Sequence, residues 1–322
     1  MKQPKTLQAA IIFYADLDNC LSHLVAQRWP DGVTCPTCGG KDVKFIPTRR
    51  IWECKTKHAK KQFSIKVGTI FEDSPIGLDK WLTASWMVAN CKNGVSSYEI
   101  HRAIGVTQKT AWFMLHRIRL AMQDEDGGKL GGSGTPVQAD ETFIGGKARN
   151  MHKAKRAKMN GAFSDNKVIV AGVLETGGKV KTQIVENRSM RTLHALVKEH
   201  IEPGSTLHTD DFYGYWGLAK DYVHDVVNHA ETYVSGKVHT NGLENFWSLV
   251  KRGLHGTYVS VEPFHLFRYL DEQVFRYNNR ATKKKFISDF DRFSMVTDSI
   301  LGKRITYEQL IGRATQFGAQ AN

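Results

Sequence analysis

Three acidic residues of this chain lie in segments that predict three different pieces of secondary structure. Asp140 lies in the alternating run TPVQADETFIGG, which is typical of a strand. Asp210 lies in STLHTDDFYGY, where another extended run ends in a turn. Glu244 lies in TNGLENFWSLVKRGLHG, whose apolar spacing predicts a helix that Asn241 can cap. We therefore expect an α/β fold that aims the three carboxylates at a common point.

The predicted helix around Glu244 has two distinct faces. At 100° per residue, Glu244 and Lys251 share one face, with Lys251 about 10 Å further along the axis. Leu243, Phe246 and Val250 line another face that can pack on the strands. The carboxylate and the ammonium group therefore point the same way.

Three carboxylates in this arrangement suit a two-metal phosphodiester site. Two divalent ions roughly 4 Å apart can activate an oxygen nucleophile and stabilise the leaving 3′ oxygen when DNA is cut and rejoined. Mg²⁺ prefers hard oxygen ligands, so carboxylates and substrate phosphate oxygens form a suitable cage. The alternative is that the three are solvated charges or caps, because the chain has 32 acidic residues to choose from. Their placement on two strands and a helix favours the metal site.

A cysteine motif predicts a second metal site near the N-terminus. The sequence CPTCGG forms a tight knuckle in which backbone amides can turn toward the thiolates of Cys35 and Cys38. Cys54 ends the strand-like run RRIWEC, and His58 follows four residues later. Three thiolates and one imidazole suit a single tetrahedral, structural Zn²⁺. The alternative is a small cluster of buried thiols with an exposed His58.

The segment between these two sites predicts a DNA-binding pair of helices. Apolar spacing predicts a helix from Leu78 to Cys91, and SSYEIHRAIGVTQKTAWFMLHRIRLAM then predicts two helices joined by a turn at Gly105. Ser96 and Thr107 can cap these two helices. The pattern matches a helix-turn-helix, although any helical hairpin has similar spacing. The second helix would turn its first residues toward the major groove, and these are Gln108, Lys109 and Thr110.

Two polar segments flank the first acidic strand. DEDGGKLGGSGTP favours neither helix nor strand, so we expect a flexible glycine-rich linker at 125–136. Residues 147–158 contain six Lys or Arg and no acid, which predicts a loop that contacts phosphates; a merely solvated loop is the alternative. The residues expected to bind DNA here and near Glu244 are Lys153, Lys155, Arg156, Lys158 and Arg252.

Further segments complete the expected sheet and its cover. KVIVAGVLETGGKVKTQIVEN predicts two strands around a hairpin at Gly177 and Gly178, and RTLHALVKEHI predicts a helix before the strand of Asp210. EPFHLFRYLDEQVFRYNNR predicts an amphipathic helix at 262–280. The arginines of this helix that we expect to be available to DNA are Arg268, Arg276 and Arg280.

Composition limits the partner and the compartment. A chain of 322 residues exceeds the usual single core, so we expect two or three domains. The net charge of +13 favours a polyanionic partner. The chain has no apolar stretch of membrane-spanning length, no signal-peptide pattern and an odd number of cysteines, five. These features predict a cytoplasmic protein, associated with the nucleoid when bound to DNA, with no membrane contact and no disulfide framework.

Several longer segments carry a family resemblance. ADETFIGGK, HTDDFYGY and HTNGLENFWSLVKRGLHGTY contain the three acids, and RWPDGVTCPTCGG contains the first two cysteines. KKQFSIKVGTIFEDSPIGLDKW, VTQKTAWFMLHRIRLAM and FRYNNR extend the pattern from about residue 13 to about residue 290. Together they resemble the bacterial insertion-sequence DDE transposases of the ISXO2-like group, which have an N-terminal zinc ribbon and an RNase H-like core.

The resemblance implies a function and roles for the acids. Asp140, Asp210 and Glu244 would bind two Mg²⁺ or Mn²⁺ ions, and Lys251 would be the accompanying basic catalytic residue. The protein would bind terminal inverted repeats and target DNA as a homo-oligomer, cleave DNA and transfer the exposed 3′ hydroxyl to the target. Some relatives use a non-acidic third residue near Asn241, but the carboxylate of Glu244 is the better metal ligand.

Two of the acids have an acidic neighbour. Glu141 follows Asp140, and Asp211 follows Asp210. Adjacent strand residues face opposite sides of a sheet, so only one residue of each pair can face the site. The resemblance favours Asp140 and Asp210.

We therefore expect an α/β multidomain protein with a zinc ribbon, a helix-turn-helix and an RNase H-like mixed-sheet catalytic core. The expected parts are an N-terminal helix and zinc ribbon at 1–70, a helix-turn-helix region at 71–124, the linker at 125–136, the catalytic domain at 137–295 and a C-terminal tail at 296–322. Two other functions stay open: an RNase H-like nuclease that only hydrolyses, and a transposase-derived DNA-binding regulator without catalysis. The intact acid set speaks against the regulator.

Overall fold

A computed structural model of the chain describes residues 3–124, 127–132, 134–146, 153, 167–227, 240–283 and 285–313. The chain forms two compact units. The first contains Met1–Gln123 together with Asn279–Asn322, and the second contains Asp124–Asn278. The second unit therefore ends earlier than the boundary at 295 that we expected from the sequence.

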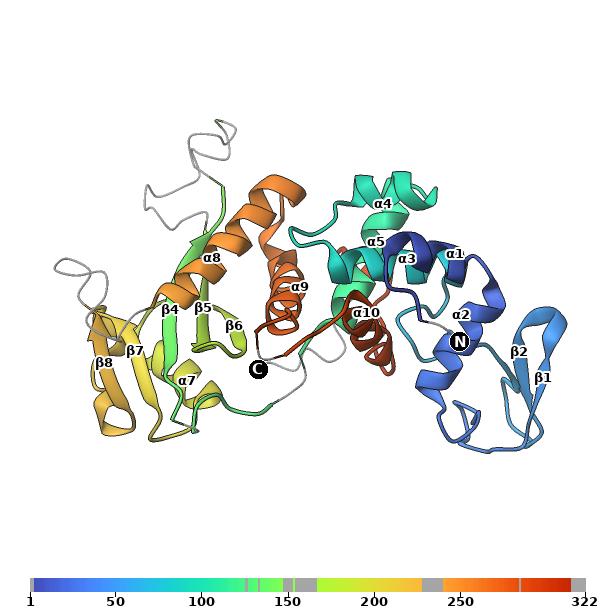
Figure 1. Cartoon of the computed structure of the whole chain (residues 1–322), viewed down its shortest axis with the longest axis horizontal. Coiled ribbons are helices and arrows are strands. Elements are labelled where there is room, and N and C mark those ends of the chain that lie inside the picture. The colour runs from blue at the N-terminus through green and yellow to red at the C-terminus, as the bar shows by residue number, and fades with distance from the viewer. Residues whose placement is uncertain are drawn as a thin grey trace. The chain divides into compact units, whose positions relative to one another are not determined.

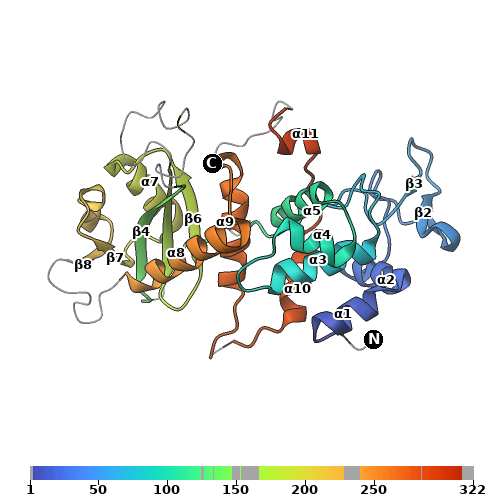
Figure 2. The same ribbon diagram turned by 90° about the horizontal axis from the view of Figure 1, so that it is seen from above.

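The described α-helices of the first unit are α1 (Leu7–Tyr14), α2 (Leu17–Arg28), α3 (Leu78–Asn90), α4 (Ser97–Ile104), α5 (Gln108–Ala121), α10 (Asp289–Asp298) and α11 (Tyr307–Leu310) (Figures 1 and 2). Ser96 forms a capping box with Glu99 at the start of α4, and the Thr107 side chain caps α5. Gly105 ends α4 with φ 61°, a conformation that favours glycine. None of the described helices is long and apolar enough to cross a membrane.

The last part of the chain completes the core of the first unit. Phe293 of α10 is fully buried, and its ring lies 5.5 Å from that of Tyr14 and 5.2 Å from that of Trp86. Asn90 of α3 donates a hydrogen bond to the carbonyl of Asp289. The helix α10 therefore packs with α1 and α3 from the beginning of the chain. Residues 296–313 are not a separate tail, because Gly302 donates to the Gly68 carbonyl and Tyr307 packs edge-on against Phe113.

A small antiparallel sheet lies between α2 and α3 in the sequence. Its described strands are β1 (Val43–Ile46), β2 (Ile51–Cys54) and β3 (Gln62–Phe63), in the order β1-β2-β3. Trp52 stacks on Phe63 at 5.9 Å, and Trp29 packs edge-on against Trp52 at 5.5 Å. This aromatic group is the apolar core of a sheet that is too short to bury more.

The second unit is a mixed sheet covered by helices on both faces. Its described strands and α-helices are β4 (Val137–Ile144), β5 (Val168–Glu175), β6 (Val180–Val185), α7 (Met190–His200), β7 (Thr206–Asp210), β8 (Val223–Val227), α8 (Asn241–Gly253) and α9 (Leu266–Asn278). The strand order is β6-β5-β4-β7-β8. The pairs β6–β5 and β5–β4 are antiparallel, whereas β4–β7 and β7–β8 are parallel. The predicted hairpin at Gly177 and Gly178 is confirmed: it joins β5 and β6, and Gly177 has φ 75°.

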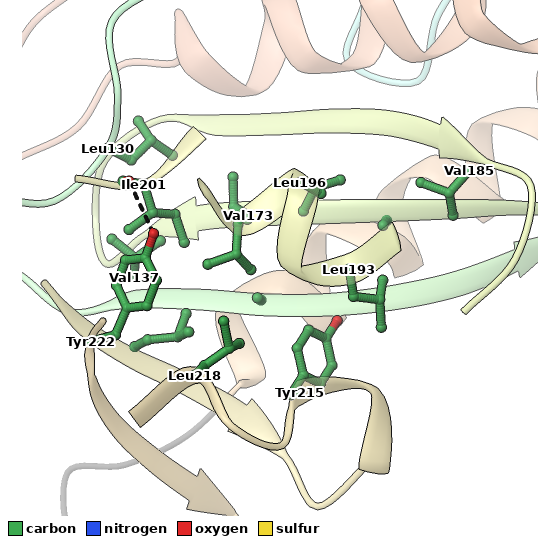
Figure 3. Close-up of a cluster of buried hydrophobic side chains, with 14 residues drawn as sticks. Leu130, Val137, Val173, Val185, Leu193, Leu196, Ile201, Tyr215, Leu218 and Tyr222 are labelled. Carbon is green, nitrogen blue, oxygen red and sulfur yellow. Dashed lines mark hydrogen bonds between the residues drawn. The ribbon is translucent and has the colours of Figure 1, made fainter. Parts of the chain in front are cut away.

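The two faces of the sheet pack on different helices, as Figure 2 shows for α7 and α8. On one face, Val137 and Val173 pack with Leu193 and Leu196 of α7 (Figure 3). The members of the opposite cluster come from the strands, α8 and α9, and include Val170, Leu174, Leu243, Phe246 and Trp247. Odd-numbered residues of β4 therefore face α7 and even-numbered residues face α8.

The segment before β4 is held on the second unit. Leu130 is buried, its N–H donates to the carbonyl of His200 at 2.7 Å, and its carbonyl accepts from Glu202 at 2.9 Å. Gly132 donates to Ser205 Oγ at 3.0 Å. The described part of 125–136 thus differs from the flexible linker that we expected, because Leu130 supplies a buried apolar side chain within the glycine-rich run.

Candidate functional site

Asp140 lies in the middle of β4 and faces α8. Its Oδ2 accepts a hydrogen bond of 3.1 Å from the indole Nε1 of Trp247, and its Oδ1 accepts one of 2.8 Å from the backbone N–H of Glu141. Burial, followed by the charges of Glu141 and Asp210, raises the pKa of Asp140 to about 7, although both hydrogen bonds lower it. A carboxylate in this position attracts a cation, because a bound cation favours its ionised form.

Asp210 shares a sheet face with Asp140. In the parallel pair β4–β7, Gln138 lies opposite His208, and Asp140 and Asp210 follow two residues later on each strand. Side chains two residues apart point to the same face, so both aspartates lie on the side covered by α8. Asp211 follows the end of β7 and is exposed.

Glu141 belongs to the opposite face and has different partners. Its side chain is only 4% exposed and forms an ion pair of 3.0 Å with Arg188. Tyr215 donates a hydrogen bond of 2.8 Å to the other carboxylate oxygen. The Arg188 guanidinium also stacks over the ring of Phe212 at 4.5 Å. These contacts tie β4 to the segment after β7.

The helix α8 is attached to β4 near Glu244. The N–H of Leu243 donates to Gln138 Oε1 at 3.0 Å. Glu244 is exposed, and its Oε1 accepts a hydrogen bond of 3.1 Å from Thr240. Thr240 is the N-cap residue and Asn241 is the first residue of α8, so the cap lies one residue earlier than we expected.

Two lysines lie near each other at the far end of α8. Lys251 is exposed in the last turn of α8. The pKa of Lys167, just before β5, is lowered first by the partial burial of Lys167 and then by the charge of Lys251. Arg252 is also exposed. Clustered cations of this kind can bind a phosphate group.

Four predicted zinc ligands meet in the first unit. Cys35 Sγ, Cys38 Sγ, Cys54 Sγ and a His58 ring nitrogen lie within 4.8 Å of one another. Among the described residues no other His, Cys, Asp or Glu set of three or more is gathered this closely, so the oxygens of Asp140, Asp210 and Glu244 do not meet. The Cys3His set fits a tetrahedral Zn²⁺ site.

Local geometry orients the zinc ligands. Cys35 N–H donates to the Gly40 carbonyl at 2.9 Å, and Gly39 N–H donates to the Cys35 carbonyl at 2.8 Å, which closes the knuckle. Burial raises the pKa of the Cys35 thiol, but the N–H groups of Cys38 and Thr37 more than offset it, so the pKa is lowered. His58 Nδ1 lies 2.5 Å from the Ala59 carbonyl, which leaves Nε2 to face the sulfurs.

Two family models match this chain, one in each unit. Residues 129–278 match a family model described as the ISXO2-like transposase domain, and residues 16–58 match a transposase zinc-ribbon domain. An uncharacterized transposase-like protein of Haemophilus influenzae is 32% identical over 108 residues, which cover 33% of this chain and 87% of that protein. The chain belongs to the ISXO2-like transposase family. An uncharacterized protein in transposable element ISH50 of Halobacterium salinarum is 27% identical over 246 residues, or 72% of this chain and 82% of that protein.

In this ISXO2-like family member, the residues expected to read DNA lie in the first turn of α5. Gln108 donates a hydrogen bond of 2.8 Å to Ser97 Oγ, and the Lys109 ammonium lies 4.5 Å from the ring centre of Tyr307 in α11. The N–H of Thr110 donates to the capping Thr107. The Thr110 hydroxyl also lies 2.8 Å from the Thr107 hydroxyl, so all three side chains have intramolecular partners.

The other residues expected to bind DNA have mixed surroundings. Lys153 is exposed, whereas Lys155, Arg156 and Lys158 lie outside the described residues. The expectation that Arg276 is available to DNA was wrong, because it is buried and forms an ion pair with Glu272. A carboxylate one helical turn earlier was the sequence signal for this pair.

Sequence reasoning missed two residues beside Asp140 and one near Lys251. Trp247, Gly172 and Lys167 all lie near the α8 face of the sheet. The spacing of α8 placed Trp247 beside other apolar positions, but its hydrogen bond to Asp140 depends on tertiary packing. Gly172 became informative only when the β4–β5 register paired it with Asp140.

Proposed function

We propose that the chain is a DNA transposase of an insertion sequence, which binds terminal inverted repeats and catalyses metal-dependent cleavage and strand transfer. The observation that carries this proposal is the placement of Asp140 and Asp210 on one face of adjacent parallel strands, beside the helix of Glu244. Carboxylates in this arrangement are a suitable donor set for Mg²⁺ or Mn²⁺. The transposase family match supports DNA as the substrate.

The acids fit divalent ions by their chemistry. Burial, the charge of Glu141 and the charge of Asp210 together raise the pKa of Asp140, and a bound cation offsets this penalty on its ionised form. Both aspartates would hold the ions, and Glu244 would join them after its side chain turns away from Thr240. When bound, two such ions lower the pKa of an attacking water and stabilise charge on the phosphate.

The basic residues near α8 would hold the DNA backbone. Lys251 and Lys167 are close enough for their charges to interact, which favours a phosphate group between or beside them. Lys251 is seven residues from Glu244, too far along the helix for a relaxed ion pair. We therefore assign Lys251 to phosphate binding.

We further propose that Asp124–Asn278 is an RNase H-like catalytic domain and that α4 and α5 form a helix-turn-helix. Three antiparallel strands followed by two parallel strands, with α8 across one face, support the first assignment. Two capped helices joined at a left-handed Gly105 support the second. The first turn of α5 would then approach the major groove.

Assembly and location follow from the proposed reaction. Transposition joins two DNA ends, so the active form would be a homo-oligomer on DNA. The net charge of +13 supports a nucleic-acid partner, and we place the protein in the cytoplasm, at the nucleoid.

The metal-ligand variants test this proposal. Asp140→Asn, Asp210→Asn and Glu244→Gln should each abolish cleavage of DNA that carries the terminal repeats, because each removes a ligand charge. Binding of the same DNA should stay within about twofold of wild type, since the residues assigned to repeat recognition are elsewhere in the chain. Asp211→Asn is the matched control and should retain cleavage, because Asp211 is exposed beyond the strand.

Two other outcomes would change the assignment. An inactive Asp211→Asn variant together with an active Asp210→Asn variant would make Asp211 the ligand. A wild-type protein that binds the repeats in Mg²⁺ but never cuts them would favour a DNA-binding regulator.

A further inference from the structure

The residue opposite Asp140 on the neighbouring strand is a glycine. Asp140 pairs with Gly172 in the antiparallel register of β4 and β5. Gly172 does not have a positive φ, so residues other than glycine can adopt its backbone conformation. A Cβ atom there would lie 2.8 Å and 2.9 Å from two ring carbons of Trp247. The glycine therefore provides the space in which the indole ring lies on the sheet.

The indole ring uses this space to reach Asp140. Trp247 is 4% exposed and belongs to the apolar cluster between α8 and the sheet. Its Nε1 donates the hydrogen bond of 3.1 Å to Asp140 Oδ2. A buried indole N–H requires an acceptor, and here the acceptor is the acid assigned to the metal site.

The neighbouring Phe246 shows what packing alone requires. It is fully buried in the same cluster and packs edge-on against Tyr277 at 5.1 Å. A phenyl ring thus fills the core on this helix without a polar group. Packing alone therefore does not account for an indole at position 247, whose N–H bonds to Asp140.

We infer that Trp247 is a positioning residue that fixes the carboxylate of Asp140 for divalent metal binding, with Gly172 as the space that admits its ring. This inference rests on the proposed metal-binding role of Asp140. Trp247 holds Oδ2, and the Glu141 N–H holds Oδ1. A carboxylate has about four lone-pair positions, so each oxygen retains one for a cation while its direction is set. Hydrogen bonds to ligands typically change metal affinity by about 10-fold to 100-fold.

Metal binding without DNA tests the inference. We would titrate the full-length protein with Mn²⁺ and measure free ion by electron paramagnetic resonance. Trp247→Phe, which keeps an aromatic ring but removes the N–H, should weaken Mn²⁺ binding by about 10-fold or more. Phe246→Leu is the matched packing control and should keep wild-type affinity. Gly172→Ala should weaken binding as well, because its new methyl group displaces the ring.

A second measurement uses the wild-type protein and does not depend on a folded Trp247 variant. In ¹⁵N–¹H spectra, one indole resonance should shift on Mg²⁺ addition, and that shift should be absent in Asp140→Asn. Wild-type affinity in Trp247→Phe, or equal losses in Trp247→Phe and Phe246→Leu, would overturn the positioning role. An Asp140→Asn variant that binds Mn²⁺ like wild type would instead overturn the proposed metal site itself.

Discussion

Asp140 and Glu141 are adjacent carboxylates with different surroundings, because neighbouring strand residues face opposite sides of the sheet. Glu141→Ala removes the partner of Arg188 and the acceptor of Tyr215. We expect it to lower the free energy of unfolding of the second unit by about 2 kcal/mol, a value reduced for the partial exposure of Arg188. Urea denaturation measures this change, and Mn²⁺ affinity should stay near the wild-type value. A normal stability with lost Mn²⁺ binding would make Glu141 the ligand.

Lys251 gives a second prediction at the scale of single residues. If it binds a phosphate, Lys251→Ala should weaken DNA binding and reduce the salt dependence of the affinity by about one charge. Lys251→Arg should restore most of the binding, because it keeps the charge. Affinities measured over a range of salt concentrations provide the test. An unchanged salt slope with an altered Mg²⁺ dependence would favour an ion pair with Glu244.

Sequence patterns predicted some of these residues and missed others for a physical reason. Strand alternation is local, so it separates Asp140 from Glu141 without a structure. The contact between Trp247 and Asp140 depends on where α8 lies on the sheet, and the role of Gly172 depends on the β4–β5 register. Neither can be read from spacing along the chain.

At the scale of elements, the zinc ribbon should depend on its metal. β1, β2 and β3 enclose little more than the aromatic group around Trp52, so metal binding would supply much of their folding energy. Protein prepared without chelator should contain about one equivalent of zinc by elemental analysis. Chelation should expose Trp52 and raise the emission wavelength of its fluorescence. Less than half an equivalent in untreated protein would contradict the site, and full zinc in His58→Ala would remove that ligand alone.

The helical core of the first unit should weaken in acid because of His23. Its ring stacks on Phe293 at 5.3 Å and contacts Thr297, and burial lowers its pKa from 6.5 to about 4. Above pH 6.5 His23 is neutral in both the folded and the unfolded chain. As the pH falls from 6.5 to about 4, only the unfolded chain binds the proton, so the free energy of unfolding decreases. The shift corresponds to about 3 kcal/mol.

His23→Phe is the control for this effect. It keeps an aromatic ring but cannot bind a proton, so the stability difference between wild type and variant should change by about 3 kcal/mol between pH 7 and pH 4. Zinc release in acid affects both proteins equally and cancels in the difference. A difference that does not vary with pH would contradict the role of His23.

Elements defined by local signals were predicted better than those defined by distant partners. The caps at Ser96 and Thr107 and the hairpin at Gly177 follow from nearby residues, and the structure has them there. The place of α10 was missed because its core partners lie on α1 and α3, at the other end of the sequence. Leu130 was missed because its bridge partner, Ile201 at the end of α7, is also remote in the sequence.

At the scale of the whole molecule, the chain starts in one unit, forms the other and returns to the first. The residues assigned to repeat recognition, α4 and α5, belong to the first unit, and the acids belong to the second. A variant that disables the acids should therefore leave repeat recognition intact. This separation distinguishes loss of chemistry from loss of DNA binding in a single assay.

Strand transfer with pre-cleaved ends tests the central claim most directly. Linear DNA that ends in the terminal repeats of the surrounding element, with a free 3′ hydroxyl, would be mixed with target plasmid, Mg²⁺ and the full-length protein. We predict that the wild type joins these ends to the plasmid, and that Asp140→Asn binds the ends equally well but forms no joined product. Ends that are hydrolysed but never joined would contradict the claim in favour of a nuclease. Joining by Asp140→Asn at the wild-type rate would contradict the proposed catalytic site.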